Sequence, residues 1–100
     1  AAPSVNVCVF AESQIDRSPT GSGVTARMAA MHARGFAGIG ETRTFGSITG
    51  SEFTGSIQSV TKAGPHDAVT VRVSGRAYYC GEATFIVEED DPLRGGFLLR

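Results

Sequence analysis

A single helical segment among strand-like segments is the feature that most constrains the fold of this chain. Within residues 20–34, Val24, Met28 and Met31 recur at the spacing of one helix face, and alanines fill most of the other positions. Gly35 follows directly, and glycine is typical of a helix end. We therefore predict one helix that begins near residue 20, ends near residue 34 and lets other elements approach it closely.

The rest of the chain is predicted to form strands. Residues 4–10 alternate valines with Asn6 and Cys8, which is the period of a strand. Beyond the helix, Thr, Val, Ile, Phe and Tyr predominate, and turn residues divide the segment. Further strands are predicted at 41–50, 51–60, 68–75 and 76–89, and a short apolar run at 96–100 follows a charged turn at 88–96. One helix with so many antiparallel strands indicates an α+β fold, in which the strands curl around a central helix.

Length and composition exclude several classes of protein. The 100 residues suffice for one domain, and no apolar run approaches the roughly 20 residues of a membrane span. The net charge of −1 is unlike that of a nucleic-acid-binding domain. Cys8 and Cys80 lack a CxxC spacing, so we predict reduced, buried thiols in a cytoplasmic protein and no metal site. Because the chain opens almost directly into an apolar run without a methionine, we expect a piece of a longer polypeptide.

Between the first strand and the helix lies the loop DRSPTGSG, residues 16–23. The first amides of a helix have no partner within it and carry partial positive charge, so Gly21 and Ser22 suit a carboxylate or a phosphate. A phosphate-binding loop would need a lysine after the glycines, and none follows here. Asp16 beside an anion site suits a zwitterion such as an amino acid. Residue by residue, the alternative of ordinary turn and capping chemistry is favoured, with Thr20 as the N-cap.

Taken as a string, the loop resembles a motif of a known enzyme family. DRSPTGSG is similar to the DRSPCGTGT motif of the proline racemase family, which includes hydroxyproline epimerases and dehydratases. The preceding VCVFAESQI and the tail FIVEEDDPLRGGFLLR resemble the same family, so the resemblance covers the whole chain but only about the last third of a typical member. It implies a diaminopimelate epimerase-like fold of two lobes, each with strands wrapped around a helix and with the active site between the helix mouths. Residues 1–100 would then be a single domain, the C-terminal lobe, with the N-terminal lobe absent.

The resemblance also implies a mechanism. Racemases of this family use two cysteines, one per lobe, as bases on opposite faces of the substrate's α-carbon, without a cofactor. Thr20 stands at the position of the second cysteine. An aliphatic hydroxyl is a far weaker acid than a thiol, so Thr20 without an adjacent base is not expected to remove a proton. One base on the other lobe still permits loss of water from a β-hydroxy substrate, and within the family this threonine resembles the dehydratases of trans-3-hydroxy-L-proline, which form Δ1-pyrroline-2-carboxylate.

The resemblance assigns roles to five residues. Asp16 matches the ligand of the ring nitrogen, the amides of Gly21 and Ser22 hold the carboxylate, and Phe10 forms an aromatic wall against the ring. Thr20 is the predicted catalytic residue, hydrogen-bonded to the substrate or to a water that protonates the departing hydroxide. The implied partner is a small imino acid. Neither nucleic acid, membrane, cofactor nor metal is implied, and a homodimer stays open.

Two other functions stay open at this point. The parent protein could be a proline or hydroxyproline racemase or epimerase with an unusual second residue. Alternatively, the chain could be an amino-acid-binding fragment without catalysis. Because the catalytic cysteine of the other lobe is absent from these 100 residues, the isolated chain is expected to be inactive.

Overall fold

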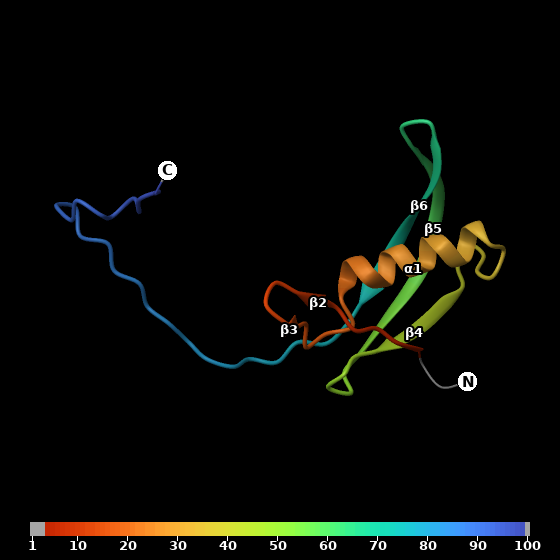
Figure 1. The fold of residues 1–100 in the computed structure, drawn as a ribbon, viewed down its shortest axis with the longest axis horizontal. Coiled ribbons are helices and arrows are strands. Elements are labelled where there is room, and N and C mark those ends of the chain that lie inside the picture. Colours follow the sequence, from red (N-terminus) through yellow and green to blue (C-terminus); the bar gives the residue numbers. More distant parts are fainter. Residues whose placement is uncertain (1–3, 100) are drawn as a thin grey trace.

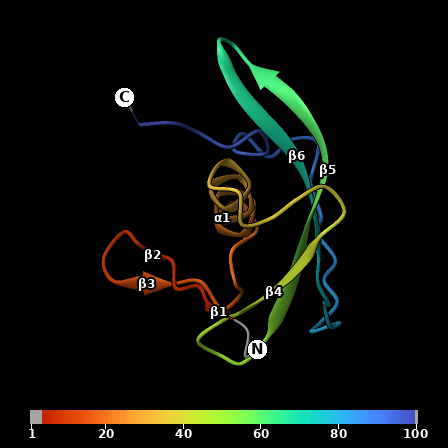
Figure 2. The same ribbon diagram turned by 90° about the vertical axis from the view of Figure 1, so that its right-hand side faces the viewer.

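Helix α1 (Gly21–Ala33) packs against one face of a four-stranded sheet (Figure 1; Figure 2). The computed structural model describes residues 4–99. The sheet order is β1-β4-β5-β6, and β2 pairs with β3 in a separate two-stranded hairpin. The strands are β1 (Ser4–Val5), β2 (Val9–Phe10), β3 (Gln14–Ile15), β4 (Thr42–Gly46), β5 (Glu52–Ala63) and β6 (His66–Ser74). The prediction of one helix with mainly antiparallel strands is confirmed.

The ends of α1 lie within one residue of the predicted ends. Val24 and Met28, two members of the predicted apolar stripe, are fully buried, and Met31 packs against them from a partly buried position. The amide of Gly35 bonds back to the last turn, with a φ of +77° that glycine adopts readily. No helix within residues 4–99 has the length and apolar character needed to cross a membrane.

The core lies between α1 and the sheet. Val24 and Met28 of the helix meet Phe45 of β4 and Ile57 of β5, and each of these side chains is at most 1% exposed. Gly55 on β5 lets the helix come this close, because a Cβ there would lie 2.8 Å from Cγ1 of Val24 and 3.0 Å from Cγ of Met28. The expected close approach of other elements to the helix is thus confirmed.

The sheet covers one side of α1 and does not surround it. β4, β5 and β6 are antiparallel, whereas β1 lies parallel to β4. Four strands at the usual spacing form a layer about 15 Å wide, only slightly wider than a helix with its side chains. Figure 2 shows the sheet on one side of the helix and the β2–β3 hairpin beside it. The prediction that strands curl around the helix therefore holds for one face, because so few strands cannot enclose it.

The strand predicted at 4–10 is interrupted. Its first part, β1, pairs with β4, whereas its last part, β2, turns back and pairs with β3 inside a segment predicted as loop. Ala11 and Ser13 have positive φ values of 45° and 64°, which reverse the chain tightly between β2 and β3. The two halves of the segment thus have different neighbours, and this change of partner ends the first strand.

The prediction of a strand at 76–89 is wrong. Residues 76–99, here called the C-terminal arm, run away from the helix and the sheet (Figure 1). Tyr79, Phe85 and Leu99 on the arm are at least 91% exposed. A composition rich in aromatic and β-branched residues indicates a fit to a pleated, half-buried surface. Among residues 4–99, no strand pairs with the arm, and its aromatic and β-branched side chains therefore have no sheet to join.

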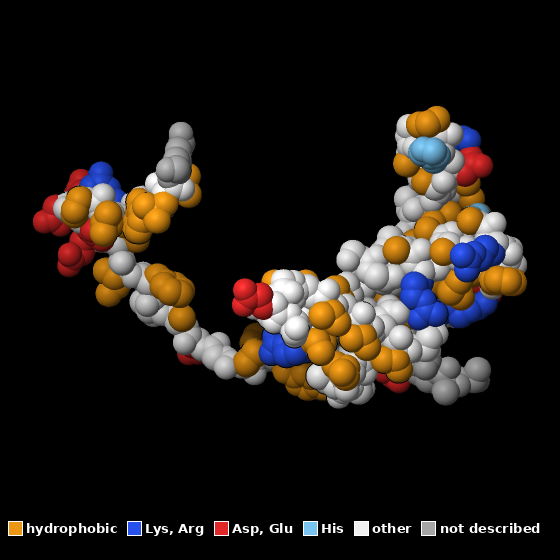
Figure 3. Space-filling model, in the orientation of Figure 1, with side chains coloured by type: hydrophobic (Ala, Val, Ile, Leu, Met, Phe, Trp, Pro, Cys, Tyr) orange, Lys and Arg blue, Asp and Glu red, His pale blue; other side chains and the backbone are white. Residues whose placement is uncertain are grey.

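The arm bends at the predicted charged turn. The amide of Asp91 donates to the carbonyl of Glu88, and the amide of Leu93 donates to Oδ1 of Asp91 at 2.9 Å. Figure 3 shows the acidic side chains at this bend, with hydrophobic side chains along the arm on both sides of it. The apolar run predicted at 96–100 is exposed up to Leu99, and Arg100 lies outside the described residues.

Candidate functional site

The loop before α1 is built around the carboxylate of Asp16. Oδ1 of Asp16 accepts a hydrogen bond of 2.8 Å from the amide of Ser18, and Oδ2 accepts one of 3.0 Å from the hydroxyl of Thr20. The Ser18 hydroxyl oxygen in turn accepts a hydrogen bond of 3.0 Å from the amide of Thr20. The structure therefore brings together Asp16 and Thr20, two of the predicted site residues. It adds Ser18, which the sequence did not single out.

These hydrogen bonds hold the pKa of Asp16 below its usual value of 3.8. The backbone amide of Ser18 is the main cause, followed by the Ser18 side chain and the Thr20 hydroxyl, and the charge of Arg17 adds to them. Asp16 is therefore ionised at neutral pH. A carboxylate has about four lone-pair sites, so one bond at each oxygen leaves room for a cationic donor such as a ring ammonium.

Thr20 has an unusual backbone conformation, with φ of 67° and ψ of 108°. A β-branched residue rarely adopts a positive φ, and such strain costs on the order of 1–3 kcal/mol. Thr20 occupies the N-cap position of α1, but its side chain caps no helix amide and is bonded to Asp16 instead. The prediction of Thr20 as the N-cap residue is therefore confirmed for its position, whereas the side-chain capping bond expected with it is not formed. The interpretation of Asp16 as a turn residue is confirmed, because its carboxylate accepts a hydrogen bond from the amide two residues on, that of Ser18.

The mouth of α1 presents free backbone amides. The first hydrogen bond of the α-helical type runs from the amide of Val24 to the carbonyl of Thr20, at 2.9 Å, so the amides of Gly21 and Ser22 precede it. No side chain within residues 4–99 caps this end, and a Cβ added at Gly21 would have nothing within 4 Å. The amides of Gly21 and Ser22 thus have no partner within the helix, and the carboxylate ligand expected there stays a prediction.

A hollow of about 690 Å³ lies beside this helix mouth. One wall is the chain between β1 and β2, and the other is the first two turns of α1. Of the predicted site residues, Thr20 and Ser22 line it. The residues that line it are Asn6, Val7, Cys8, Val9, Thr20, Ser22, Gly23, Ala26 and Arg27.

Both cysteines differ from the expectation of buried thiols. Cys8 is half-buried and lines the hollow at the helix mouth, and Cys80 is exposed on the C-terminal arm. Their positions follow from the two errors in the strand predictions, because Cys8 lies where the first strand is interrupted and Cys80 lies on the unpaired arm. Within residues 4–99, no group of three or more His, Cys, Asp or Glu side chains could hold a metal ion.

Phe10 lies apart from the other predicted site residues. It sits at the end of β2, pairs with Gln14 and is 49% exposed, and it does not line the hollow. The β2–β3 hairpin that carries it is tied to the loop, because the amide of Asp16 donates to the carbonyl of Cys8 at 3.0 Å. The proposed aromatic wall therefore belongs to an element anchored at Asp16, but these residues alone do not place Phe10 against a ligand.

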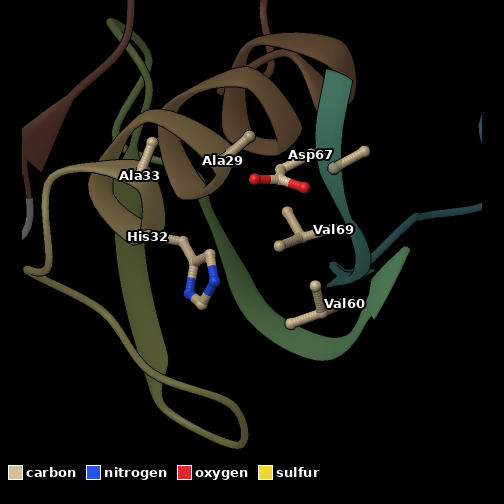
Figure 4. Close-up of a pocket in the computed structure, with 7 residues that line it drawn as sticks. Ala29, His32, Ala33, Val60, Asp67 and Val69 are labelled. Carbon is tan, nitrogen blue, oxygen red and sulfur yellow. The ribbon is translucent and has the colours of Figure 1, made fainter. Parts of the chain in front are cut away.

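A second hollow, of about 450 Å³, lies at the other end of α1, against the β5–β6 hairpin. His32, Ala29 and Ala33 of the helix line it together with Val60, Val69 and Asp67 of the hairpin (Figure 4). Nδ1 of His32 lies 2.9 Å from the carbonyl oxygen of Ala37, so this ring nitrogen has a partner in the fold. The hollow contains none of the predicted site residues.

Comparison with known proteins identifies the family. The family model described as proline racemase matches residues 1–98. The trans-L-3-hydroxyproline dehydratase of Bos taurus is 57% identical over 99 residues, and the human trans-3-hydroxy-L-proline dehydratase is 54% identical. The proline racemase of Clostridioides difficile is 41% identical over 95 residues.

The same family appears among solved structures. A hydroxyproline epimerase from Agrobacterium vitis, with bound trans-4-hydroxy-L-proline, aligns with a TM-score of 0.77 and 35% identity. The alignment covers 95% of this chain and 27% of that chain. The match to the bovine dehydratase likewise covers 98% of this chain and 28% of that relative, so the chain spans little more than a quarter of the relatives' length. By its sequence and its fold, the chain belongs to the proline racemase family.

Proposed function

We propose that the parent protein dehydrates trans-3-hydroxy-L-proline to Δ1-pyrroline-2-carboxylate, and that these residues form one of its two lobes. The lobe is of the diaminopimelate epimerase-like type, and the other lobe supplies the cysteine base. The observation that supports this proposal most is the state of Thr20. At the position of a racemase thiol stands a hydroxyl whose proton is directed at the carboxylate of Asp16, 3.0 Å away.

This arrangement suits one-base chemistry. A hydroxyl with a pKa far above that of a thiol cannot become a base at neutral pH without help. Its neighbour Asp16 gives little help, because the same hydrogen bonds hold the pKa of this carboxyl below 3.8. We therefore assign no proton abstraction to the face of the substrate next to Thr20.

The proposed reaction needs a single base. The cysteine thiolate of the other lobe takes the α-proton, and the electron pair of the Cα–H bond becomes the Cα–Cβ double bond. The bond between Cβ and the 3-hydroxyl breaks, and the departing hydroxide takes a proton from water. The thiol then returns the α-proton to the water, which neutralises the hydroxide formed there and regenerates the thiolate. The enamine product then tautomerises to Δ1-pyrroline-2-carboxylate, with no change in oxidation state overall and no further reactant.

The residues of the loop bind and orient the substrate in this proposal. The amides of Gly21 and Ser22 receive the carboxylate at the positive end of α1, and Asp16 receives the ring ammonium. Because Thr20 donates its proton to Asp16, its lone pairs are free to accept a hydrogen bond from a water that protonates the leaving hydroxide. Phe10 supplies the aromatic wall once the other lobe closes the site.

The experiment uses the full-length parent protein. We incubate it with trans-3-hydroxy-L-proline, and separately with L-proline, in heavy water and follow both by proton NMR. Conversion of the hydroxyproline to Δ1-pyrroline-2-carboxylate without inversion of L-proline supports the dehydratase. Appearance of D-proline supports the alternative of a racemase and requires a second base. Binding of either compound without turnover supports the alternative of a non-catalytic binding protein.

A further inference from the structure

We propose that Asn6 and Arg27 are positioning residues that hold Thr20 in its strained conformation. The proposal rests on the function proposed above, because it assigns a role at the same site. Its starting point is the positive φ of Thr20, which a β-branched residue keeps only where the surrounding structure enforces it.

The peptide bond between Pro19 and Thr20 is held at both of its polar ends. The carbonyl oxygen of Pro19 accepts a hydrogen bond of 3.0 Å from Nδ2 of Asn6, and the amide of Thr20 donates one of 3.0 Å to the hydroxyl oxygen of Ser18. Because φ is the dihedral angle between this peptide plane and the Cα–C bond of Thr20, and the Thr20 carbonyl is held by the amide of Val24 at 2.9 Å, holding the plane restrains φ. Asn6 is thus the restraint on the carbonyl side.

Arg27 decides which way the Asn6 carboxamide faces. Its Nη1 donates a hydrogen bond of 2.9 Å to Oδ1 of Asn6. A guanidinium group has donors only, so Oδ1 must face Arg27 and the NH2 group must face the carbonyl of Pro19. Without Arg27 the amide could rotate by half a turn and present its oxygen to that carbonyl.

The guanidinium of Arg27 is itself tied to the rigid part of the fold. It lies 4.9 Å from the centroid of the Phe45 ring, and Phe45 is 1% exposed in the core. Its Nη2 also donates to the hydroxyl of Ser4 at 3.2 Å. The backbone amide of Asn6 donates to the carbonyl of Gly46 at 2.9 Å, which anchors Asn6 to β4. A chain of contacts therefore runs from the core through Arg27 and Asn6 to Thr20.

The decisive variant is Asn6→Asp in the full-length parent protein. A carboxylate has the same shape as the carboxamide and binds Arg27 at least as well, but it cannot donate to Pro19 and places a negative oxygen against that carbonyl. The variant loses the hydrogen bond to Pro19 and sets a carboxylate oxygen against the Pro19 carbonyl oxygen. This loss should lower the rate of dehydration by about tenfold or more. We expect kcat for dehydration to fall about tenfold with KM nearly unchanged.

A second readout does not depend on activity. Hydrogen exchange of peptides spanning residues 16–23, followed by mass spectrometry, reports the protection of the Thr20 amide. We expect Asn6→Asp to speed this exchange. Gln58→Glu is the matched control, because it makes the same amide-to-carboxylate change on the exposed face of β5, and it should change neither readout.

A third variant covers the case in which Asn6→Asp does not fold. Arg27→Lys keeps the charge and an apolar stem against Phe45 but loses the planar fork that orients Asn6. It should lower kcat and speed exchange in residues 16–23 in the same direction. Because Arg27 acts through Asn6, the double variant should lose no more than the larger single loss.

The outcomes separate this proposal from the proposed function. Wild-type rates of both dehydration and exchange in Asn6→Asp would overturn the positioning role, as would fully additive losses in the double variant. If the wild-type protein does not dehydrate trans-3-hydroxy-L-proline, but Asn6→Asp still speeds exchange in residues 16–23, the proposed function is wrong and the positioning role stands.

Discussion

The hydroxyl of Thr20 donates a hydrogen bond of 3.0 Å to Oδ2 of Asp16. The two residues are four positions apart, at either end of a loop that bends at Arg17 and Ser18. Because one side chain is a donor and the other an ionised acceptor, the bond fixes the direction of the Thr20 proton. It also helps to hold the pKa of Asp16 below 3.8. The predicted binding residue and the predicted catalytic residue therefore depend on each other.

Replacing Thr20 by cysteine in the full-length parent should create a base on the face of the substrate next to Thr20, where the wild type is proposed to have none. We expect Thr20→Cys to add exchange of the α-proton of L-proline with heavy water from that face, because a thiol can ionise near neutral pH. Thr20→Ser, which keeps a hydroxyl, is the control and should show no added exchange. Proton NMR in heavy water measures both. Equal exchange in the wild type and Thr20→Cys would count against the proposed position of Thr20 beside the α-carbon.

Removing the charge of Asp16 should weaken substrate binding. In the full-length parent, Asp16→Asn exchanges an ionised acceptor for a neutral amide, and a hydrogen bond to a charged group contributes about 1.5–3 kcal/mol. We expect KM for trans-3-hydroxy-L-proline to rise by at least about tenfold in steady-state kinetics. Asp67→Asn is the matched control, since Asp67 lies in the β6 strand and its side chain is 83% exposed. A KM equal to that of the wild type would exclude Asp16 as a ligand.

The lowered pKa of Asp16 predicts how the loop responds to pH. The folded-state pKa lies below 3.8, so the hydrogen bonds of Asp16 stabilise the loop above that pH and are lost as the pH falls through the lowered value. A carbon-13 NMR titration of the Asp16 carboxyl should show a midpoint below 3.8. Thr20→Val removes one of the donors and should move the midpoint upward. A midpoint at 3.8 or above in the unmodified protein would contradict the hydrogen-bonded loop.

Filling the space at Gly55 should destabilise the contact between α1 and β5. A Cβ there would lie 2.8 Å from Cγ1 of Val24, and inserting a methyl group into a packed core costs about 1–3 kcal/mol. We expect Gly55→Ala to lower the midpoint of thermal unfolding of the full-length protein. Gly81→Ala on the arm meets nothing within 4 Å and should leave that midpoint unchanged. Equal midpoints for both variants would mean that α1 can move away from β5 without a loss of stability.

The exposed apolar side chains of the arm should make the isolated 100-residue chain self-associate. Large apolar side chains such as Phe85, Leu98 and Leu99 are at least 80% exposed, and such surfaces bind other apolar surfaces in water. We expect the chain to bind a hydrophobic fluorescent dye and to self-associate in analytical ultracentrifugation. The variant Phe85→Ser/Leu98→Ser should do both to a smaller extent. Monomeric behaviour of the unmodified chain without dye binding would contradict the exposure of the arm.

Local signals in the sequence determined the parts of the fold that depend on near neighbours. The period of Val24 and Met28, with Gly35 behind them, places the helix because its hydrogen bonds join residues four apart. The alternating segments around Gly64 likewise predict two strands that the structure joins as β5 and β6. The loop DRSPTGSG indicated Asp16 and the helix mouth, because its residue types are each suited to a turn or to an anion.

Tertiary structure alone decided the features that need a partner from elsewhere in the chain. Residues 76–89 of the arm are about as rich in β-branched and aromatic residues as β6, yet they have no strand to pair with among the described residues. The donor that holds the Pro19 carbonyl comes from Asn6, 13 positions away, and the group that orients Asn6 comes from Arg27, 21 positions away. The local spacing of residues predicts neither which strands pair nor which side chains form hydrogen bonds. Both depend on which distant residues the fold brings to hydrogen-bond distance. For this reason the sequence predicted the loop and the helix, whereas only the fold revealed how Thr20 is held.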